Sequence, residues 1–201
     1  MTHQYRVTKY DPRKRDRWGA YPADDWIGQD QIGQTFGGVV LTAAEYQRVE
    51  DAYVAAAMAF VRESGGEALR VTTLENHGGH AEPGLRLVEG ALLSGAGLER
   101  VCRLNLRGML WCKLEDAAGG RFVHFGYDYY MYVGVPARCE GAIALARRLG
   151  LFVEDFASPH REESEEDPDG LRPAVKGSPP RKTAKRELAG ALLDGTVSPS
   201  A

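Results

Sequence analysis

Residues 122–135, with the sequence FVHFGYDYYMYVGV, decide which fold we expect for this chain. Successive side chains of a β-strand point to opposite faces of a sheet, so alternate residues share one face. One alternate set is apolar or aromatic throughout: Val123, Phe125, Tyr127, Tyr129, Met131, Val133 and Val135. The other set is mixed: Phe122, His124, Gly126, Asp128, Tyr130, Tyr132 and Gly134. The stretch therefore predicts a strand whose first set lies on the core.

The glycine within this stretch leaves two other interpretations open. Glycine inside a strand often marks a bulge, so Gly126 could bend the strand locally. A tight turn at Gly126, Tyr127 and Asp128 would instead divide the stretch into two strands, and the assignment of faces would then no longer hold.

Helices are predicted on both sides of the strand region. Over residues 41–66, Thr42 and Glu45 have the spacing of a capping box, apolar residues recur every three or four positions, and Gly65 and Gly66 follow. A second amphipathic helix is expected over 137–150, where arginines near the end complement the helix dipole. Helical spacing also predicts helices over 85–95 and 98–110.

Further strands complete the expected fold. Strands are predicted over residues 4–10, as an edge strand, at the start of 68–84, and over 110–116 and 151–156. The AAGG sequence before residue 121 predicts a hairpin. We therefore expect a single α+β domain over residues 1–160, with a mostly antiparallel sheet packed by helices. Residues 161–201 are charged and rich in proline, and they predict a disordered tail.

Composition excludes several classes of function. The formal net charge of −3 is too small to indicate a nucleic-acid or membrane-surface protein. No apolar run approaches the length of a membrane span, and no apolar leader is visible near the start. The three cysteines, Cys102, Cys112 and Cys139, are odd in number and widely spaced, which favours reduced thiols and a cytoplasmic location.

Binding is the preferred role of the mixed face. Tyrosine and tryptophan offer large, rigid contact areas with a polar tip and are common in binding hot spots. The predicted recognition surface combines Asp128, Tyr130 and Tyr132 with rings of the irregular segment 11–38: Trp18, Tyr21 and Trp26. The aspartate favours a basic protein partner. A solvated or loop-covered face with no binding role is the simpler alternative.

An enzyme centred on His124 is the second hypothesis. His124 would act as a base, with Asp128, a tyrosine such as Tyr130, or Cys112 assisting. The spacing opposes a direct pair with Asp128, because four strand residues span roughly 13 Å. A strand cysteine such as Cys112 is more often a small buried hydrophobic residue.

Metal and nucleic-acid binding are the weaker hypotheses. His77 and His80 in NHGGH, with Glu75 or Glu82, have the spacing of metal ligands, but the segment lacks the helical placement of known zinc motifs. The basic sequences DPRKRDRW and PPRKTAKR could contact phosphates, although acidic residues lie beside both. No cofactor motif is present, so no cofactor is expected.

The overall pattern resembles small bacterial immunity-type proteins in its general character, through the α+β arrangement and the acidic, tyrosine-rich face. This resemblance implies a non-catalytic protein-binding or regulatory module with a protein partner. It carries over no individual site residues.

Overall fold

A computed structural model describes residues 2–22, 24–126 and 128–161. The predicted tail, residues 161–201, lies outside this description except for Arg161. Among the described residues, no helix combines the length and hydrophobicity needed to cross a membrane.

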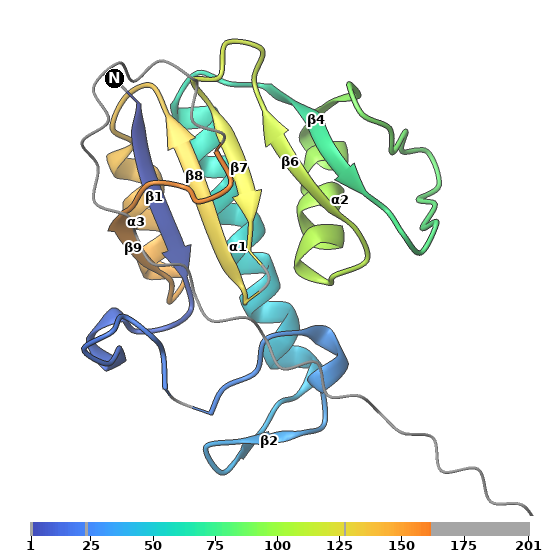
Figure 1. Cartoon of the computed structure of the whole chain (residues 1–201). Helices are drawn as coiled ribbons and strands as arrows, with labels where there is room; N and C mark the ends of the chain where they lie inside the picture. Colours follow the sequence, from blue (N-terminus) through green and yellow to red (C-terminus); the bar gives the residue numbers. More distant parts are fainter. Residues whose placement is uncertain (1, 23, 127, 162–201) are drawn as a thin grey trace, which may run out of the picture. The chain divides into compact units, whose positions relative to one another are not determined.

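The described residues form an α+β fold around a seven-stranded sheet with the order β5-β4-β6-β7-β8-β1-β9 (Figure 1). Its strands are β1 (His3–Thr8), β4 (Ala68–Glu75), β5 (Leu92–Ser94), β6 (Trp111–Glu115), β7 (Phe122–Phe125), β8 (Tyr130–Val135) and β9 (Phe152–Asp155). Every neighbouring pair runs antiparallel. The predicted fold class is confirmed.

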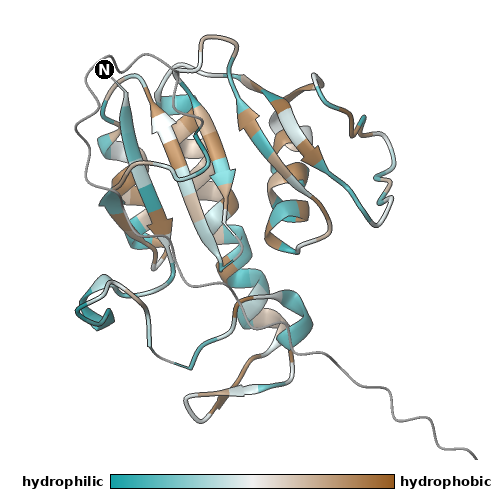
Figure 2. Ribbon diagram, viewed as in Figure 1, coloured by the Kyte–Doolittle hydropathy of each residue, from teal (hydrophilic) through white to brown (hydrophobic). Residues whose placement is uncertain are grey.

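Three helices cover one face of the sheet: α1 (Ala43–Glu63), α2 (Gly95–Leu106) and α3 (Glu140–Arg148) (Figure 1). The core lies between these helices and the sheet, where apolar residues line the helix side of the strands (Figure 2). Tyr53 and Phe60 of α1 are completely buried there, and the Phe60 ring lies 5.4 Å from that of Tyr5 in β1.

Helix α1 begins and ends where its sequence predicts. The Thr42 hydroxyl accepts a hydrogen bond from the Glu45 backbone N–H at 3.1 Å, which satisfies one of the free donors of the first turn. The Glu45 carboxylate binds Arg48 at 2.7 Å instead of reaching back to Thr42. Only the Thr42 half of the predicted capping box is therefore observed. Gly65, with φ of 76°, adopts the left-handed conformation that follows many helix ends.

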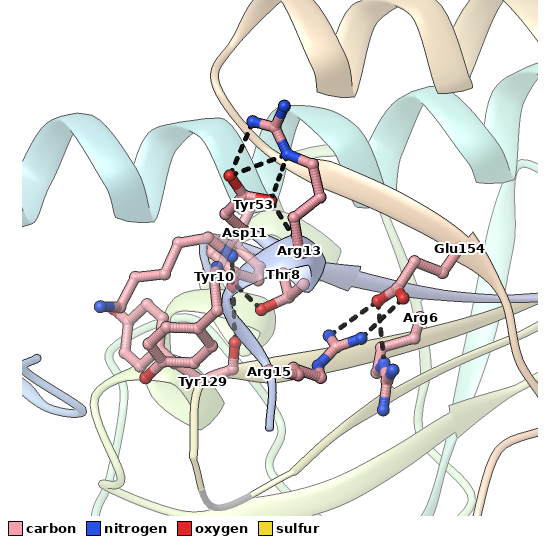
Figure 3. A network of polar contacts seen from close by, with 10 residues as sticks. Arg6, Thr8, Tyr10, Asp11, Arg13, Arg15, Tyr53, Tyr129 and Glu154 are labelled. Atoms are coloured by element: carbon pink, nitrogen blue, oxygen red, sulfur yellow. Dashed lines mark hydrogen bonds and ion pairs between the residues drawn. The ribbon is translucent and has the colours of Figure 1, made fainter. Parts of the chain in front are cut away.

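The prediction of one continuous strand over residues 122–135 was wrong, and the alternative with a turn is confirmed. Strand β7 ends at Phe125, and β8 begins at Tyr130 and runs back beside it. The Gly126 N–H donates to the Tyr130 carbonyl at 2.7 Å, which closes the turn. Tyr129 has an unfavourable positive φ of 59°, and the Tyr53 hydroxyl donates to its carbonyl at 2.6 Å (Figure 3).

Two other predictions were wrong. Residues 85–95 do not form a helix, because the segment pairs with β4 instead: the Val71 N–H donates to the Ala91 carbonyl, and Leu93 is buried opposite Leu69. Strand β1 is not an edge strand, since it lies between β8 and β9. In both cases pairing with distant strands outweighs the local pattern.

Residues 11–41 form a long connection that the sheet and α1 hold in place. It contains the short 3-10 turns η1 (Pro12–Lys14) and η2 (Gln29–Gln31) and a two-stranded hairpin of β2 (Thr35–Phe36) and β3 (Val39–Val40). Arg15 forms a bidentate pair with Glu154 of β9, with both N–O distances below 3 Å (Figure 3). The carbonyl of the buried Trp26 accepts a hydrogen bond from the Tyr10 hydroxyl. The segment is therefore anchored to β9 through Arg15 and to the core through Trp26.

Candidate functional site

The face of the sheet opposite the helices is crossed by residues 156–161, which we call the closing segment (Figure 1). Its Phe156 and Ser158 N–H groups donate to the backbone carbonyl and side-chain oxygen of Gln4 in β1 at 3.0 and 2.9 Å. The His160 ring packs edge-on against Tyr132 and Trp111. The mixed face of the 122–135 stretch is thus largely covered by the chain itself.

His124 lies under this segment and has no exposed surface. Its Nε2 atom is 2.9 Å from a Glu115 carboxylate oxygen, and its Nδ1 atom is 3.0 Å from the Ser158 hydroxyl oxygen. Burial lowers the pKa of His124 to about 4, and the opposing effect of Glu115 is smaller. We therefore assign a neutral imidazole that donates from Nε2 to Glu115 and accepts the Ser158 hydroxyl at Nδ1.

The partners of His124 differ from those nominated by the sequence. Cys112 lies in the core on the helix side of β6, next to Asn105, and burial raises its thiol pKa to about 11. Asp128 is exposed in the turn after β7. Glu115 could have been found from the β6–β7 hairpin register, because it pairs with Phe122 beside His124. Ser158 carries no local signal, since only the crossing of the closing segment brings it to His124.

Two of the six predicted binding residues, Tyr132 and Trp26, are buried. Tyr132 is 7% exposed beneath Phe156 and His160, and Trp26 is 7% exposed against Tyr46 and Tyr129. Tyr130 is half-buried, and so is Tyr21, whose ring centre lies 4.7 Å from that of Tyr10. Trp18, by contrast, is 78% exposed.

A cavity of about 430 Å³ opens at the end of the sheet where the β7–β8 turn lies, and we call it the turn-end cavity. Its apolar lining includes Ile27, Leu106, Met109, Trp111, Phe125 and Tyr129, and its acidic residues are Asp30 and Glu75. Ile27 and Met109 remain 37% and 42% exposed. Apolar walls with a few charged groups are typical of binding pockets.

A buried ion cluster lies behind this cavity. The fully buried Glu50 carboxylate accepts two hydrogen bonds from Arg107, at 2.6 and 2.8 Å, and one from Arg103 at 2.8 Å. Burial raises the pKa of Glu50, but the two guanidinium groups together lower it by more than burial raises it, so the pKa lies below its ordinary value. Because Glu50 neutralises Arg107, Asp30 and Glu75 dominate the charge of the described lining.

The β2–β3 hairpin and the turn before it expose aliphatic side chains, and we call residues 32–40 the aliphatic arm. Val39 and Val40 are 71% and 52% exposed, and Ile32 is 36% exposed. The arm directly follows η2, whose Asp30 and Gln31 line the turn-end cavity. Figures 1 and 2 show the hairpin beyond the main sheet and hydrophobic colouring along it.

The weaker candidates from the sequence are dispersed. His77 lies 3.6 Å from Glu75 and His80 lies 3.3 Å from Glu82, while no group of three potential metal ligands occurs in the described part of the chain. In the basic N-terminal loop, Arg13 pairs with Asp11. The second basic cluster, PPRKTAKR, lies outside the described residues.

No protein-family model matches the chain, and no curated protein or solved structure shows significant similarity to it. The basis for assigning a function is therefore the chemistry of the turn-end cavity with the aliphatic arm and that of the His124 contacts.

Proposed function

We propose that this protein is a non-catalytic binding or regulatory module, in the manner of the immunity-type proteins, that takes a protein partner at the turn-end cavity and the aliphatic arm. The observation that carries this proposal is the exposure of Ile27 and Met109 in the lining of a cavity with apolar walls, together with the exposed Val39 on the arm that follows η2. Clustered exposed apolar side chains favour an interaction surface, and anchors that fill pockets supply most binding energy at interfaces.

The charge at this surface favours a partner with a basic side chain. Asp30 and Glu75 line the cavity, whereas the positive charge of Arg107 is neutralised by Glu50. A lysine or arginine of the partner would place its apolar stem against Ile27 and Met109 and its charge beside the carboxylates. This surface differs from the one expected from the sequence, of which Tyr132 is covered by the closing segment.

Capture with matched surface variants tests this proposal. The full chain would be compared with the double variant Val39→Ser/Val40→Ser and with Leu92→Ser in β5, which is 65% exposed at the sheet edge. We expect one host protein to be retained by the wild type and by Leu92→Ser, and lost with the double variant. Equal retention by all three proteins would refute the proposed surface.

A quantitative measurement on the captured partner tests the role of charge. Glu75→Gln and Asp30→Asn should each weaken binding by about 3- to 10-fold at low salt, and the loss should shrink as salt screens the charges. Glu99→Gln on α2, which is exposed and does not line the cavity, is the control. An affinity insensitive to salt and to both variants would exclude a basic partner.

A cytoplasmic location belongs to the same proposal. The three cysteines are free and buried, and burial raises the pKa of the Cys102 thiol. These features suit a reducing compartment.

A second candidate function is acyl transfer with Ser158 as nucleophile, His124 as base and Glu115 as its orienting group. The specific observation is the line of hydrogen bonds at 3.0 and 2.9 Å. Burial of both Ser158 and His124 opposes it. A fluorophosphonate probe and a p-nitrophenyl ester assay decide the matter: labelling and turnover lost in Ser158→Ala would establish catalysis, and an unlabelled wild-type protein would exclude it.

A further inference from the structure

The closing segment contacts the sheet through two imidazole rings, one beneath it and one within it. Beneath it, the Nδ1 atom of His124 lies 3.0 Å from the Ser158 hydroxyl oxygen. Within it, the His160 ring packs edge-on against Trp111 and Tyr132, with ring centres 5.7 and 5.5 Å apart, and lies 6.3 Å from the His124 ring. Both histidines therefore belong to the contact surface between the segment and the sheet.

The segment itself buries little of its surface. Ser158 is buried and His160 is half-buried. The other four residues are exposed: Phe156, Ala157, Pro159 and Arg161. Segments with few buried contacts open locally, at a lower free energy than the whole fold. We therefore expect the closing segment to detach at a lower cost in free energy than unfolding of the sheet.

Burial keeps both imidazoles neutral while the segment is closed. It lowers the pKa of His124 to about 4, and it is also the largest cause of the lowered pKa of His160. Detachment of the segment would expose the rings to water, where a histidine has its ordinary pKa of 6.5. The open form therefore binds more protons than the closed form, and acidification below pH 6.5 shifts the equilibrium toward the open form.

The charged groups that face the two rings do not reverse this direction. The Glu115 carboxylate, 2.9 Å from Nε2 of His124, favours an imidazolium, but its effect is smaller than that of burial. Lys113 of β6 lowers the pKa of both histidines, and His160 lowers that of His124. The other groups against the rings include two aromatic side chains and one guanidinium: Phe122 of β7, Tyr132 of β8 and Arg161 over the Phe122 ring.

Detachment would uncover aromatic side chains of the sheet. With the segment in place, Phe122 and Tyr132 are 3% and 7% exposed. The Tyr132 ring centre lies 5.9 Å from that of Phe156, and the Arg161 guanidinium lies 5.8 Å from the centre of the Phe122 ring. Tyrosine is enriched among binding hot spots. Opening would thus convert a covered face into a surface that a partner can contact.

We propose that the closing segment is an acid-operated switch, which lies on the sheet at neutral pH and detaches, with the sheet intact, as His124 and His160 become protonated. Detachment exposes Phe122 and Tyr132. None of residues 156–161, all of which the structure describes, lines the turn-end cavity. The switch therefore does not depend on the protein partner proposed for that cavity.

Amide hydrogen exchange of the full chain, measured by NMR at pH 7 and pH 5, tests the switch. The probes are the Phe156 and Ser158 N–H groups, which donate to Gln4. Their protection factors, corrected for the intrinsic effect of pH on exchange, should fall by about 30-fold through His124 alone, since its pKa differs between about 4 and 6.5. Protection that is unchanged at pH 5 would overturn the proposal.

Urea below the unfolding transition distinguishes detachment from unfolding of the sheet. The reference is the N–H group of the buried Val71 in β4, which donates to the Ala91 carbonyl. At pH 5, urea should accelerate exchange at Val71 far more than at Phe156 and Ser158, because local opening exposes little surface. An equal urea dependence would mean that the segment leaves only when the sheet unfolds, which would also overturn the proposal.

Histidine variants identify the groups that operate the switch. His124→Gln should remove most of the 30-fold change in protection, and His160→Gln should reduce it. His3→Gln, at an exposed position of β1, should keep the wild-type change. Because His160 is only half-buried, His160→Gln tests the switch even if His124→Gln fails to fold. A wild-type pH response in His160→Gln, or its loss in His3→Gln, would refute the switch.

Discussion

The Nδ1 atom of His124 lies 3.0 Å from the hydroxyl oxygen of Ser158, across 34 positions of sequence. This contact joins the strand that the sequence singles out to the closing segment that covers it. The other imidazole nitrogen binds Glu115, so the histidine has both of its polar atoms satisfied at complete burial. The contact therefore stabilises the closed sheet face, where the sequence predicted a binding surface.

Loss of the Ser158 hydroxyl should destabilise the fold. In Ser158→Ala the buried Nδ1 acceptor of His124 loses its donor, and an unsatisfied buried polar atom costs about 1–2 kcal/mol. Chemical denaturation should show this decrease in the free energy of unfolding. Ser94→Ala is the control, because Ser94 is exposed and its side chain makes no capping hydrogen bond. An equal, negligible change in both variants would mean that the Ser158 contact contributes no stability.

Stability should fall with acidification because of His124. Its folded pKa of about 4 lies below the ordinary value of 6.5, so between these values the unfolded chain binds more protons. The stability contributed by the neutral histidine is therefore complete above pH 6.5 and is lost as pH falls toward 4. At about 1.4 kcal/mol per pKa unit, the total loss is roughly 3 kcal/mol.

The histidine variants isolate this effect. His124→Gln keeps a donor and an acceptor but cannot titrate, so its stability should change less between pH 6.5 and 4 than that of the wild type. His77→Gln, whose side chain is 88% exposed, should keep the wild-type pH profile. Denaturation curves at several pH values measure the free energy of unfolding of both variants. If the stability of His124→Gln falls with pH as steeply as that of the wild type, groups other than His124 cause the pH dependence.

Gly134 in β8 should not tolerate a side chain. A Cβ atom at this position would lie 2.0 Å from the Phe122 ring, which packs across the strand pair. Gly134→Ala should therefore lower the free energy of unfolding by at least about 2 kcal/mol. Gly78→Ala is the matched control, because a Cβ there meets nothing within 4 Å. Near-equal unfolding midpoints for the two variants would show that Phe122 moves aside at little cost.

Removal of the buried Glu50 charge should be strongly destabilising. Glu50→Gln leaves Arg103 and Arg107 without their shared carboxylate, and breaking a buried ion pair in this way costs about 3 kcal/mol. Asp51→Asn is the control, since Asp51 contacts Arg103 from a side chain that is 53% exposed. Thermal and chemical denaturation should separate the two variants, and a similar small loss in both would mean that solvent compensates the arginines.

Strong local patterns account for the parts of the fold that could be predicted. The Thr42 cap and the regular apolar spacing of α1 are contained within one helix, and the alternation along β7 and β8 is contained within single strands. The predicted core positions Val123, Phe125 and Val133 are indeed buried, because a four-residue turn preserves the alternation. The helix predicted over 85–95 does not form, because pairing of β5 with β4 outweighs a weak helical pattern.

The candidate sites depend on contacts between distant segments, which local patterns do not encode. The aromatic residues that identified 122–135 were correctly placed in a sheet, but the closing segment covers Tyr132 and brings Ser158 to His124.

The sequence by itself determined the α+β class, the two clear helices and the core side of the central strands, because helix caps and side-chain periodicity act over a few residues. Only the tertiary structure decided the strand order, the closed sheet face and the turn-end cavity. These features arise where hydrogen bonds and burial join residues that are far apart in the chain, as between Arg15 and Glu154 or His124 and Ser158.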